Sequence, residues 1–314
     1  MKQKTNKFRK IFVLFLAFVL GTASLTSCGN SGWRSKEVTV IDDNYRTWYE
    51  IFVYSFCDSD GDQVGDLQGV ISKLDYIEDL GFNGIWLMPI MPSPSYHKYD
   101  VKDYLEIEPE YGTMADFEEL AAECDKRGIK LIIDLVLNHT SSEHPWFVAA
   151  CDYLESLEEG KEPSASECPY YEYYNFVKGN PGSDNWYQVG STDYYYEGIF
   201  WSGMPDVNFA SQALRKEFEG IVDFWLEKGA GGFRLDAVKE FYSGATGQNV
   251  EVLTWLNDYV KSVKPDAYMV GEAWEGLGTY AQYYASGIDS FFNFEFAGPT
   301  GVVTKTLTFS GENN

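Results

Sequence analysis

The 314-residue sequence predicts an α/β fold, a (β/α)8 TIM barrel that is incomplete at its C-terminus. From Trp48 onward, short β-rich runs alternate with amphipathic helical runs, which is typical of a parallel sheet whose strands are joined by helices. The run KLIIDLVLN at 130–138 is apolar on both sides, as expected for a buried parallel strand. About six strand–helix units fit before Asn314, whereas a closed barrel has eight.

The expected elements follow one another along the chain. Strands are expected at 49–56, 83–88, 130–138, 232–237 and 267–272, followed by an apolar run at 290–296. Helices are expected at 67–80, 114–126, 211–228 and 250–263, with a shorter one near Tyr280. The segment 140–205 is rich in Tyr, Gly, Ser, Pro and acidic residues and has no clean helical period, and so long an insertion is usually functional. We therefore expect a partial catalytic barrel at 45–139 and 206–314, with an inserted irregular domain at 140–205.

The N-terminal residues are expected to lie outside the fold. Five basic residues precede an apolar run at 11–20, which is too short for a spanning helix and is typical of a signal peptide. The small residues before Cys28 resemble a bacterial lipobox, in which that Cys becomes lipid-modified; an ordinary secretory signal is the alternative. We expect a lipoprotein signal peptide at 1–27 and a tether at 28–44. The chain would then be anchored through Cys28 on the extracellular face of a bacterial membrane, or secreted.

The composition narrows the class of partner. Asp and Glu number 48 against 24 Lys and Arg, a formal charge of −24, and the expected signal peptide holds five of the basic residues. Such a chain repels phosphate backbones, so we expect no nucleic acid partner; a neutral substrate and bound cations are compatible with it. Aromatic residues make up 17%, which suits either sugar-binding surfaces or an aromatic core. Of the remaining cysteines, Cys151 and Cys168 fall in one segment and could pair, but the sequence does not fix the connectivity.

Ionisable residues stand at the ends of three expected strands. Asp134 is followed by Asn138 and His139, Arg234 and Asp236 end the next strand, and Glu272 ends the one after. Because the carboxyl ends of parallel barrel strands open on one face, these groups should converge. Two carboxyl groups suit glycoside hydrolysis, with Arg234 keeping Asp236 ionised and a less polar environment raising the pKa of Glu272. The alternative for each carboxylate alone is a solvated position on the barrel rim.

Five segments, in order, resemble the signature regions of the α-amylase superfamily (glycoside hydrolase family 13). The resemblance spans about 48–296 and implies a (β/α)8 barrel with a domain inserted after the third strand. The segments are His97-Lys98-Tyr99-Asp100, Asp134-Leu-Val-Leu-Asn138-His139, Met204-Pro205-Asp206-Val207-Asn208, Gly232-Phe-Arg234-Leu-Asp236-Ala-Val-Lys239 and Gly271-Glu272-Ala-Trp274.

The resemblance implies a role for five residues. Asp236 would be the nucleophile of a retaining reaction and Glu272 the general acid and then the base, while Arg234 would orient Asp236. Tyr99 would stack on the sugar and His139 would hydrogen-bond its hydroxyls. The implied substrate is an α-glucan, such as starch or maltooligosaccharides, and the residues after Asp236 favour α-1,4 cleavage. α-Amylase, neopullulanase-like and α-glucosidase activities remain open, as does transglycosylation.

Two departures from the family pattern matter. No His-Asp pair follows Glu272, so the family's third essential carboxylate is absent from these 314 residues. We therefore expect this chain alone to be inactive or nearly so; a non-catalytic glucan-binding surface lipoprotein or pseudoenzyme is the alternative. Glu240 stands where many α-amylases have a His, which weakens the case for the calcium site that such a His and Asn138 would share.

An acidic loop after the first strand predicts a different calcium site. Oxygen-bearing residues alternate along it, as suits Ca²⁺, although Gln63 and Gly69 stand where an EF-hand has Gly and Glu. A matching loop in the superfamily branch of oligo-1,6-glucosidases implies a structural Ca²⁺, and a solvated acidic turn is the alternative. The expected ligands are Asp58, Asp60, Asp62, Val64 and Asp66.

Overall fold

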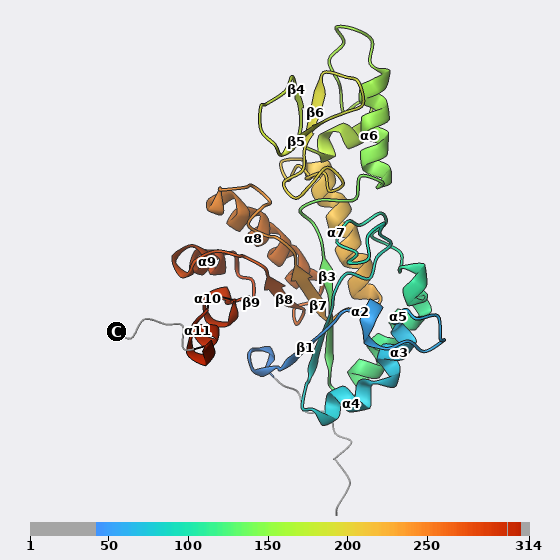
Figure 1. The fold of residues 1–314 in the computed structure, drawn as a ribbon, viewed down its shortest axis with the longest axis vertical. Coiled ribbons are helices and arrows are strands. Elements are labelled where there is room, and N and C mark those ends of the chain that lie inside the picture. Colours follow the sequence, from blue (N-terminus) through green and yellow to red (C-terminus); the bar gives the residue numbers. More distant parts are fainter. Residues whose placement is uncertain (1–41, 300, 309–314) are drawn as a thin grey trace, which may run out of the picture. The chain divides into compact units, whose positions relative to one another are not determined.

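A curled parallel sheet of six strands forms the centre of the computed structural model, which describes residues 42–299 and 301–308. Its strands, all paired in parallel, lie in the order β1-β2-β3-β7-β8-β9 (Figure 1). The fold is thus an incomplete (β/α)8 barrel, which confirms the predicted class. The bounds are β1 Trp48–Ile51, β2 Gly84–Leu87, β3 Lys130–Leu135, β7 Gly232–Leu235, β8 Tyr268–Gly271 and β9 Ser290–Phe291.

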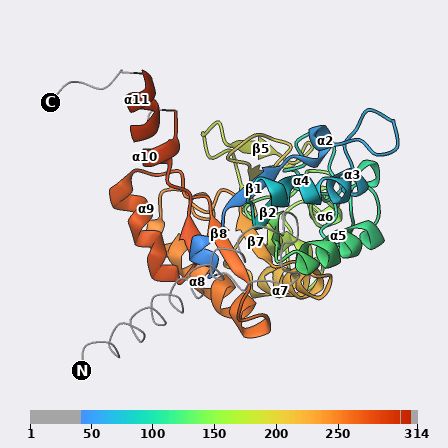
Figure 2. The ribbon, with the colours of Figure 1, turned by 90° about the horizontal axis from the view of Figure 1, so that it is seen from below.

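Helices cover the outer face of the sheet, as the two ribbon views show (Figure 1, Figure 2). Phe117 of α5 (Met114–Lys126) packs edge-on against Trp225 of α7 (Gln212–Glu227) at 5.1 Å between ring centres, and both side chains are fully buried. α5 begins where Thr113 and Asp116 form a reciprocal capping box. The larger helices are α3 Leu67–Ser72, α4 Leu74–Asp79, α5 Met114–Lys126, α7 Gln212–Glu227, α8 Thr246–Val263 and α9 Leu277–Tyr283, and the short ones are α2 Val53–Phe56, α10 Phe294–Ala297 and α11 Val302–Thr308.

The segment inserted between β3 and α7 contains a helix and a small sheet. Helix α6 (Pro145–Ser156) packs beside an antiparallel sheet in the order β4 (Phe176–Lys178), β6 (Tyr194–Glu197), β5 (Trp186–Gln188). The expectation of an irregular segment was wrong for α6. There, Pro145 occupies the first helical turn, and Phe147, Ala150 and Leu154 bury one face.

The ends of this insertion lie together at the barrel. An isolated bridge joins His139 to Asp206, and the amide of Val207 donates to the carbonyl of Asn138 at 2.9 Å. Asn138 Nδ2 also donates to Asp206 Oδ1 at 3.0 Å. The chain therefore leaves the barrel and returns to it at one place.

Several element boundaries differ from those expected. β1 ends at Ile51, and the rest of the expected strand forms α2, because the carbonyls of Tyr54 and Cys57 accept from Gly65 and Asp66 of the acidic loop rather than from a neighbouring strand. The expected helix at 67–80 divides at Lys73, where ψ is 3°. α8 begins four residues earlier than expected, at Thr246.

Three further expectations concern the signal peptide, the tether and the cysteines. Cys28, the signal peptide and most of the tether lie outside the described residues, so these stay predictions. Asp43, expected at the end of the tether, instead pairs with Lys130 at 2.8 Å and so joins the barrel. Cys151 and Cys168 are free thiols.

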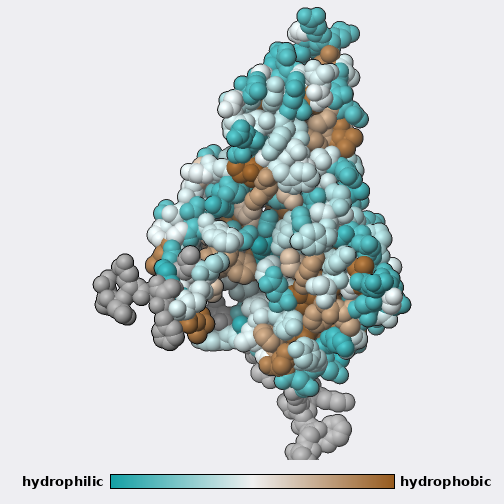
Figure 3. Space-filling view, viewed as in Figure 1, coloured by the Kyte–Doolittle hydropathy of each residue, from teal (hydrophilic) through white to brown (hydrophobic). Residues whose placement is uncertain are grey.

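In the face drawn in Figure 3, hydrophobic side chains form small separate patches rather than one continuous area. Among residues 42–299 and 301–308, no helix is both long and apolar enough to span a bilayer.

His144 generates a pH-dependent prediction. It is buried at the start of α6, where Nδ1 accepts from the amide of Trp146 at 3.1 Å, and burial lowers its pKa to about 4. In the unfolded chain His144 takes up a proton near pH 6.5, whereas in the folded protein it does so only near pH 4. The free energy of unfolding therefore falls as the pH falls from 6.5 toward 4. His144→Asn keeps a capping side chain without the titration. We expect the wild-type-minus-variant difference in unfolding free energy to fall by up to about 1.4 kcal/mol per pH unit below pH 6.5.

Urea denaturation of both proteins between pH 7.5 and 5 measures this difference. Other titrating groups are shared by both proteins and cancel in the subtraction. A difference that stays constant over this range contradicts the prediction.

Candidate active site

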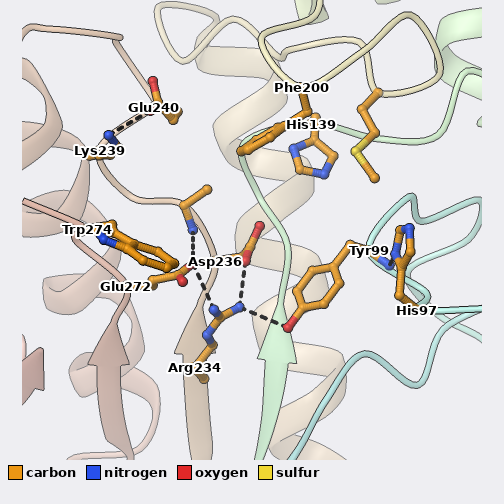
Figure 4. A pocket seen from close by; sticks show the side chains of 12 residues that line it. His97, Tyr99, His139, Phe200, Arg234, Asp236, Lys239, Glu240, Glu272 and Trp274 are labelled. Atoms are coloured by element: carbon orange, nitrogen blue, oxygen red, sulfur yellow. Dashed lines mark hydrogen bonds and ion pairs between the residues drawn. The ribbon is translucent and has the colours of Figure 1, made fainter. Parts of the chain in front are cut away.

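The ends of three neighbouring strands bring the predicted residues together. Asp134 on β3 lies directly opposite Arg234 on β7 in the parallel register. Asp236 follows β7 immediately, and Glu272 follows β8. Figure 4 shows Arg234 between Asp236, Glu272 and Tyr99.

Arg234 is buried and binds three carboxylates. Its Nη1 lies 2.9 Å from both oxygens of Asp134 and 2.6 Å from Asp236 Oδ1. Its Nη2 lies 2.8 Å from Glu272 Oε2. Burial alone would lower the pKa of this guanidinium, but the charges of Asp134 and Asp236 raise it well above its usual range. One permanently charged group therefore fixes both expected catalytic carboxyl groups.

Aromatic rings enclose the guanidinium. The centre of the Trp86 ring lies 5.1 Å from Arg234 Cζ, that of Tyr99 5.6 Å and that of Phe292 5.8 Å. These contacts are cation–π interactions. Trp86 and Phe292 were not predicted as site residues, because each belongs to a different strand region and only the curled sheet brings them to Arg234.

Asp134 lies beneath the site and is fully buried. Besides Arg234, Trp86 Nε1 donates to its Oδ2 at 3.2 Å and the Tyr99 hydroxyl donates at 3.1 Å. Burial raises the pKa of Asp134, and Arg234 opposes this. Asp134 was expected at a strand end but had no predicted role; its signal in the sequence is a lone acid inside an otherwise apolar strand.

Glu272 has the environment of a proton donor. Burial is the main cause that raises its pKa, the charge of Arg234 lowers it and that of Asp236 raises it again. The amide of Ala237 donates to Glu272 Oε2 at 3.3 Å. Ala237 adopts a left-handed φ of 46°, a strained conformation for a non-glycine residue, directly after Asp236.

A cavity of about 490 Å³ lies above these groups. Phe200 of the inserted segment and Trp274 after β8 are half-exposed at its rim (Figure 4). Both had no predicted role. Tyr99 and His139, predicted to contact sugar, line the same cavity with Arg234. Burial lowers the pKa of His139 to about 4, so it is neutral near pH 7, and its Nε2 has no hydrogen-bond partner among the described residues.

The acidic loop lies in the connection from α2 to α3. Carboxylate oxygens of Asp58, Asp60 and Asp66 lie within 4.8 Å of one another. Asp62, another of the expected ligands, is not in this group of carboxylates, and its Oδ1 accepts from the amide of Val64 at 2.8 Å. Hydrogen bonds from the amides of Gly61 and Gln63 lower the pKa of Asp58.

Residues 50–308 match the sequence profile described as "Alpha amylase, catalytic domain". The chain belongs to the alpha-amylase family. It is 44% identical to Alpha-amylase 3 of Dictyoglomus thermophilum over 294 residues, which are 93% of this chain and 52% of that protein. It is 40% identical to an oligo-1,6-glucosidase of Parageobacillus thermoglucosidasius over 202 residues, 60% of this chain and 34% of that protein.

Solved structures agree with this assignment to the alpha-amylase family. Eubacterium rectale Amy13B superposes with a TM-score of 0.83 at 54% identity and covers 88% of this chain. The alpha-amylase from H.orenii superposes with a TM-score of 0.69 at 43% identity and covers 80% of it. The present chain covers 53% and 52% of those two chains, so it spans about half the length of its relatives.

Asp134→Asn is expected to destabilise this alpha-amylase domain strongly. The substitution keeps the shape of the side chain but removes the charge that faces buried Arg234. Removing one partner of a buried ion pair lowers the free energy of unfolding by about 3–5 kcal/mol. Asp75→Asn is a matched control, because Asp75 also pairs with an arginine at 3.1 Å but its side chain is 83% exposed; there we expect less than about 1 kcal/mol.

Unfolding free energies from urea titrations of the three proteins measure both effects. Equal small losses of unfolding free energy in the two variants would show that burial of the Arg234 charge does not require Asp134.

Proposed function

We propose that this chain forms part of a retaining glycoside hydrolase that cleaves α-glucosidic bonds, with α-1,4 bonds of starch or maltodextrins as the substrate. The main support is the contact of one guanidinium, Arg234, with both Asp236 and Glu272 at the base of a cavity. The names of the relatives, an alpha-amylase and an oligo-1,6-glucosidase, also support α-glucosidic substrates.

In the proposed first step, an Asp236 carboxylate oxygen attacks the anomeric carbon while Glu272 gives its proton to the glycosidic oxygen. The bond from that carbon to the leaving sugar breaks, and a glycosyl–Asp236 ester forms. In the second step, Glu272 removes a proton from water, whose oxygen attacks the same carbon and releases Asp236. Two inversions retain the configuration, and this course needs carboxyl groups about 5–5.5 Å apart. Their contact with one guanidinium suits such a short separation.

The cavity wall suits a neutral sugar. Tyr99 offers a ring face, and neutral His139, Asp236 and Glu272 offer polar groups in the cavity wall. Phe200 and Trp274 offer further apolar faces at the rim. Carbohydrate rings combine apolar faces with hydroxyl groups, so they match both kinds of contact.

Two substitutions separate the proposed roles. Asp236→Asn removes the nucleophile and should abolish release of sugar from both maltooligosaccharides and α-glucosyl fluoride. Glu272→Gln removes only the proton donor, whose loss costs about 10²–10⁴-fold. Fluoride leaves without protonation, so this variant should release fluoride in a first turnover but few reducing ends from maltooligosaccharides.

Reducing-sugar and fluoride-electrode assays, with calorimetric binding of maltoheptaose, measure these outcomes. If a longer product of the source gene also binds maltoheptaose without any cleavage, the alternative, a non-catalytic glucan-binding protein, is favoured. Turnover that survives Asp236→Asn would exclude Asp236 as the nucleophile.

For residues 28–314 alone we expect little turnover. In the described residues, β1 and β9 each pair on one side only, so the cavity is bordered by an open sheet. The source DNA should be read beyond the codon for Asn314, and any longer product should be assayed beside the 314-residue chain.

We also propose that the acidic loop binds a structural Ca²⁺. Asp58, Asp60 and Asp66 offer clustered oxygens, which Ca²⁺ prefers, and Asp66 also caps α3 through the amide of Gly69 at 2.6 Å. Bound Ca²⁺ would neutralise the mutual repulsion of these carboxylates and hold the loop against the start of α3.

Calcium should therefore raise the melting temperature of the wild type by several degrees relative to EDTA, because a ligand that binds only the folded state stabilises it. Asp60→Asn should reduce this rise. Glu159→Gln, which removes one charge from an exposed site in the inserted segment, should keep it. Differential scanning calorimetry measures the three proteins, and an equal melting temperature of the wild type in Ca²⁺ and in EDTA contradicts the proposal.

A further inference from the structure

Lys98 adopts an unusual backbone conformation between two residues of the cavity wall. Its φ is 64°, in the left-handed region that favours glycine. The flanking residues His97 and Tyr99 both line the cavity. A non-glycine residue persists in such a conformation when its surroundings hold it there.

The Lys98 side chain points away from the cavity and into the protein. Its Nζ lies 2.9 Å from Glu108 Oε2 and 5.7 Å from the centre of the buried Tyr111 ring. The side chains of Lys98 and Glu108 are only 5% and 10% exposed. Glu110, which is half-exposed, lies 3.5 Å from the same Nζ. A lysine this deeply buried needs its charged partner.

Glu108 holds the loop at two points. Its Oε2 accepts from the amide of Ser93, at the start of the loop, at 3.2 Å, as well as from Lys98. Further along, the amide of Lys102 donates to the carbonyl of Pro92 at 2.8 Å and closes the loop. The conformation of 93–102 is thus fixed from inside the protein.

Tyr99 directly follows Lys98 in this loop, which buried Asp100 also holds by accepting from the hydroxyls of Ser93 and Ser95. With Lys98 turned inward, Tyr99 faces the site, where its hydroxyl donates to Asp134 Oδ2 and its ring lies against Arg234. Neither of these two contacts by itself sets the direction of the backbone at residue 98.

We propose that Lys98, through its buried ion pair with Glu108, is a positioning residue that fixes the Tyr99 ring for stacking on the sugar at the cleavage point. The inference rests on the proposed function. Beyond that function, Lys98 would determine the affinity for glucan without contacting the glucan.

Two variants test this in the 314-residue chain. Lys98→Met removes the charge, and Lys98→Gly removes it while permitting the left-handed φ without strain, so this variant is expected to fold. Lys102→Met is the matched control, because Lys102 pairs with Glu143 at the same 2.9 Å but the two side chains are 40% and 55% exposed.

Both Lys98 variants should show faster hydrogen–deuterium exchange confined to 93–102. Their affinity for maltoheptaose should fall by about 10- to 100-fold, since small misplacements of a binding group have effects of this size. Lys102→Met should match the wild type in both measurements. Wild-type exchange and affinity in Lys98→Gly would overturn the inference.

A double-mutant cycle with Tyr99→Ala separates positioning from general stability. If Lys98 acts through Tyr99, Lys98→Gly should cost little further affinity once the ring is gone. Additive losses would overturn the inference. If the wild type binds no glucan, the proposed function fails, and the exchange data alone decide: faster exchange at 93–102 supports the fixing of Tyr99, and unchanged exchange overturns it.

Discussion

The site depends on keeping one guanidinium charge inside the barrel. Arg234 is buried, and a buried charge is tolerated only when it is paired and hydrogen-bonded. Asp134 supplies the pairing from the neighbouring strand, Asp236 and Glu272 supply it from the rim, and Trp86 and Tyr99 add ring faces. The two rim carboxyl groups are therefore both ion-pair partners of Arg234 and the groups proposed for chemistry, so the position of each is coupled to the stability of the barrel.

The curled sheet makes this arrangement possible, and small residues allow the curl. Trp48 of β1 stacks on Tyr268 of β8 at 4.8 Å, although these strands are not neighbours in the sheet. A Cβ on Gly84 would lie 2.5 Å from the Trp48 ring, so only glycine leaves room for it. At Gly232 the φ is 143° and a Cβ would overlap the carbonyl oxygen of Tyr268. Glycines thus leave room for the close contacts that the curled sheet makes at these positions.

The sequence predicted what depends on local pattern and missed what depends on distant contacts. The α5 bounds were predicted without error because its capping and apolar period lie within one segment. The expected strand at 49–56 ran too far because Val53 and Tyr54 suit a strand, while the acidic loop's hydrogen bonds favour a helical turn there. Tyr99, Arg234, Asp236 and Glu272 lie together as expected, whereas Trp86, Phe200 and Phe292 meet them only through the tertiary fold.

The balance of charge around Arg234 indicates which carboxyl group holds a proton. Three carboxyl groups face one positive charge, so full ionisation leaves excess negative charge in a poorly solvated place. Burial raises the pKa of Asp134, and the hydrogen bonds that it accepts from Arg234 and Tyr99 oppose this rise. Burial raises the pKa of Glu272, and the negative charge of Asp236 raises it further, although the charge of Arg234 opposes both. A proton on Glu272 would relieve this excess charge, and Glu272 is the group from which the proposed acid catalysis requires it.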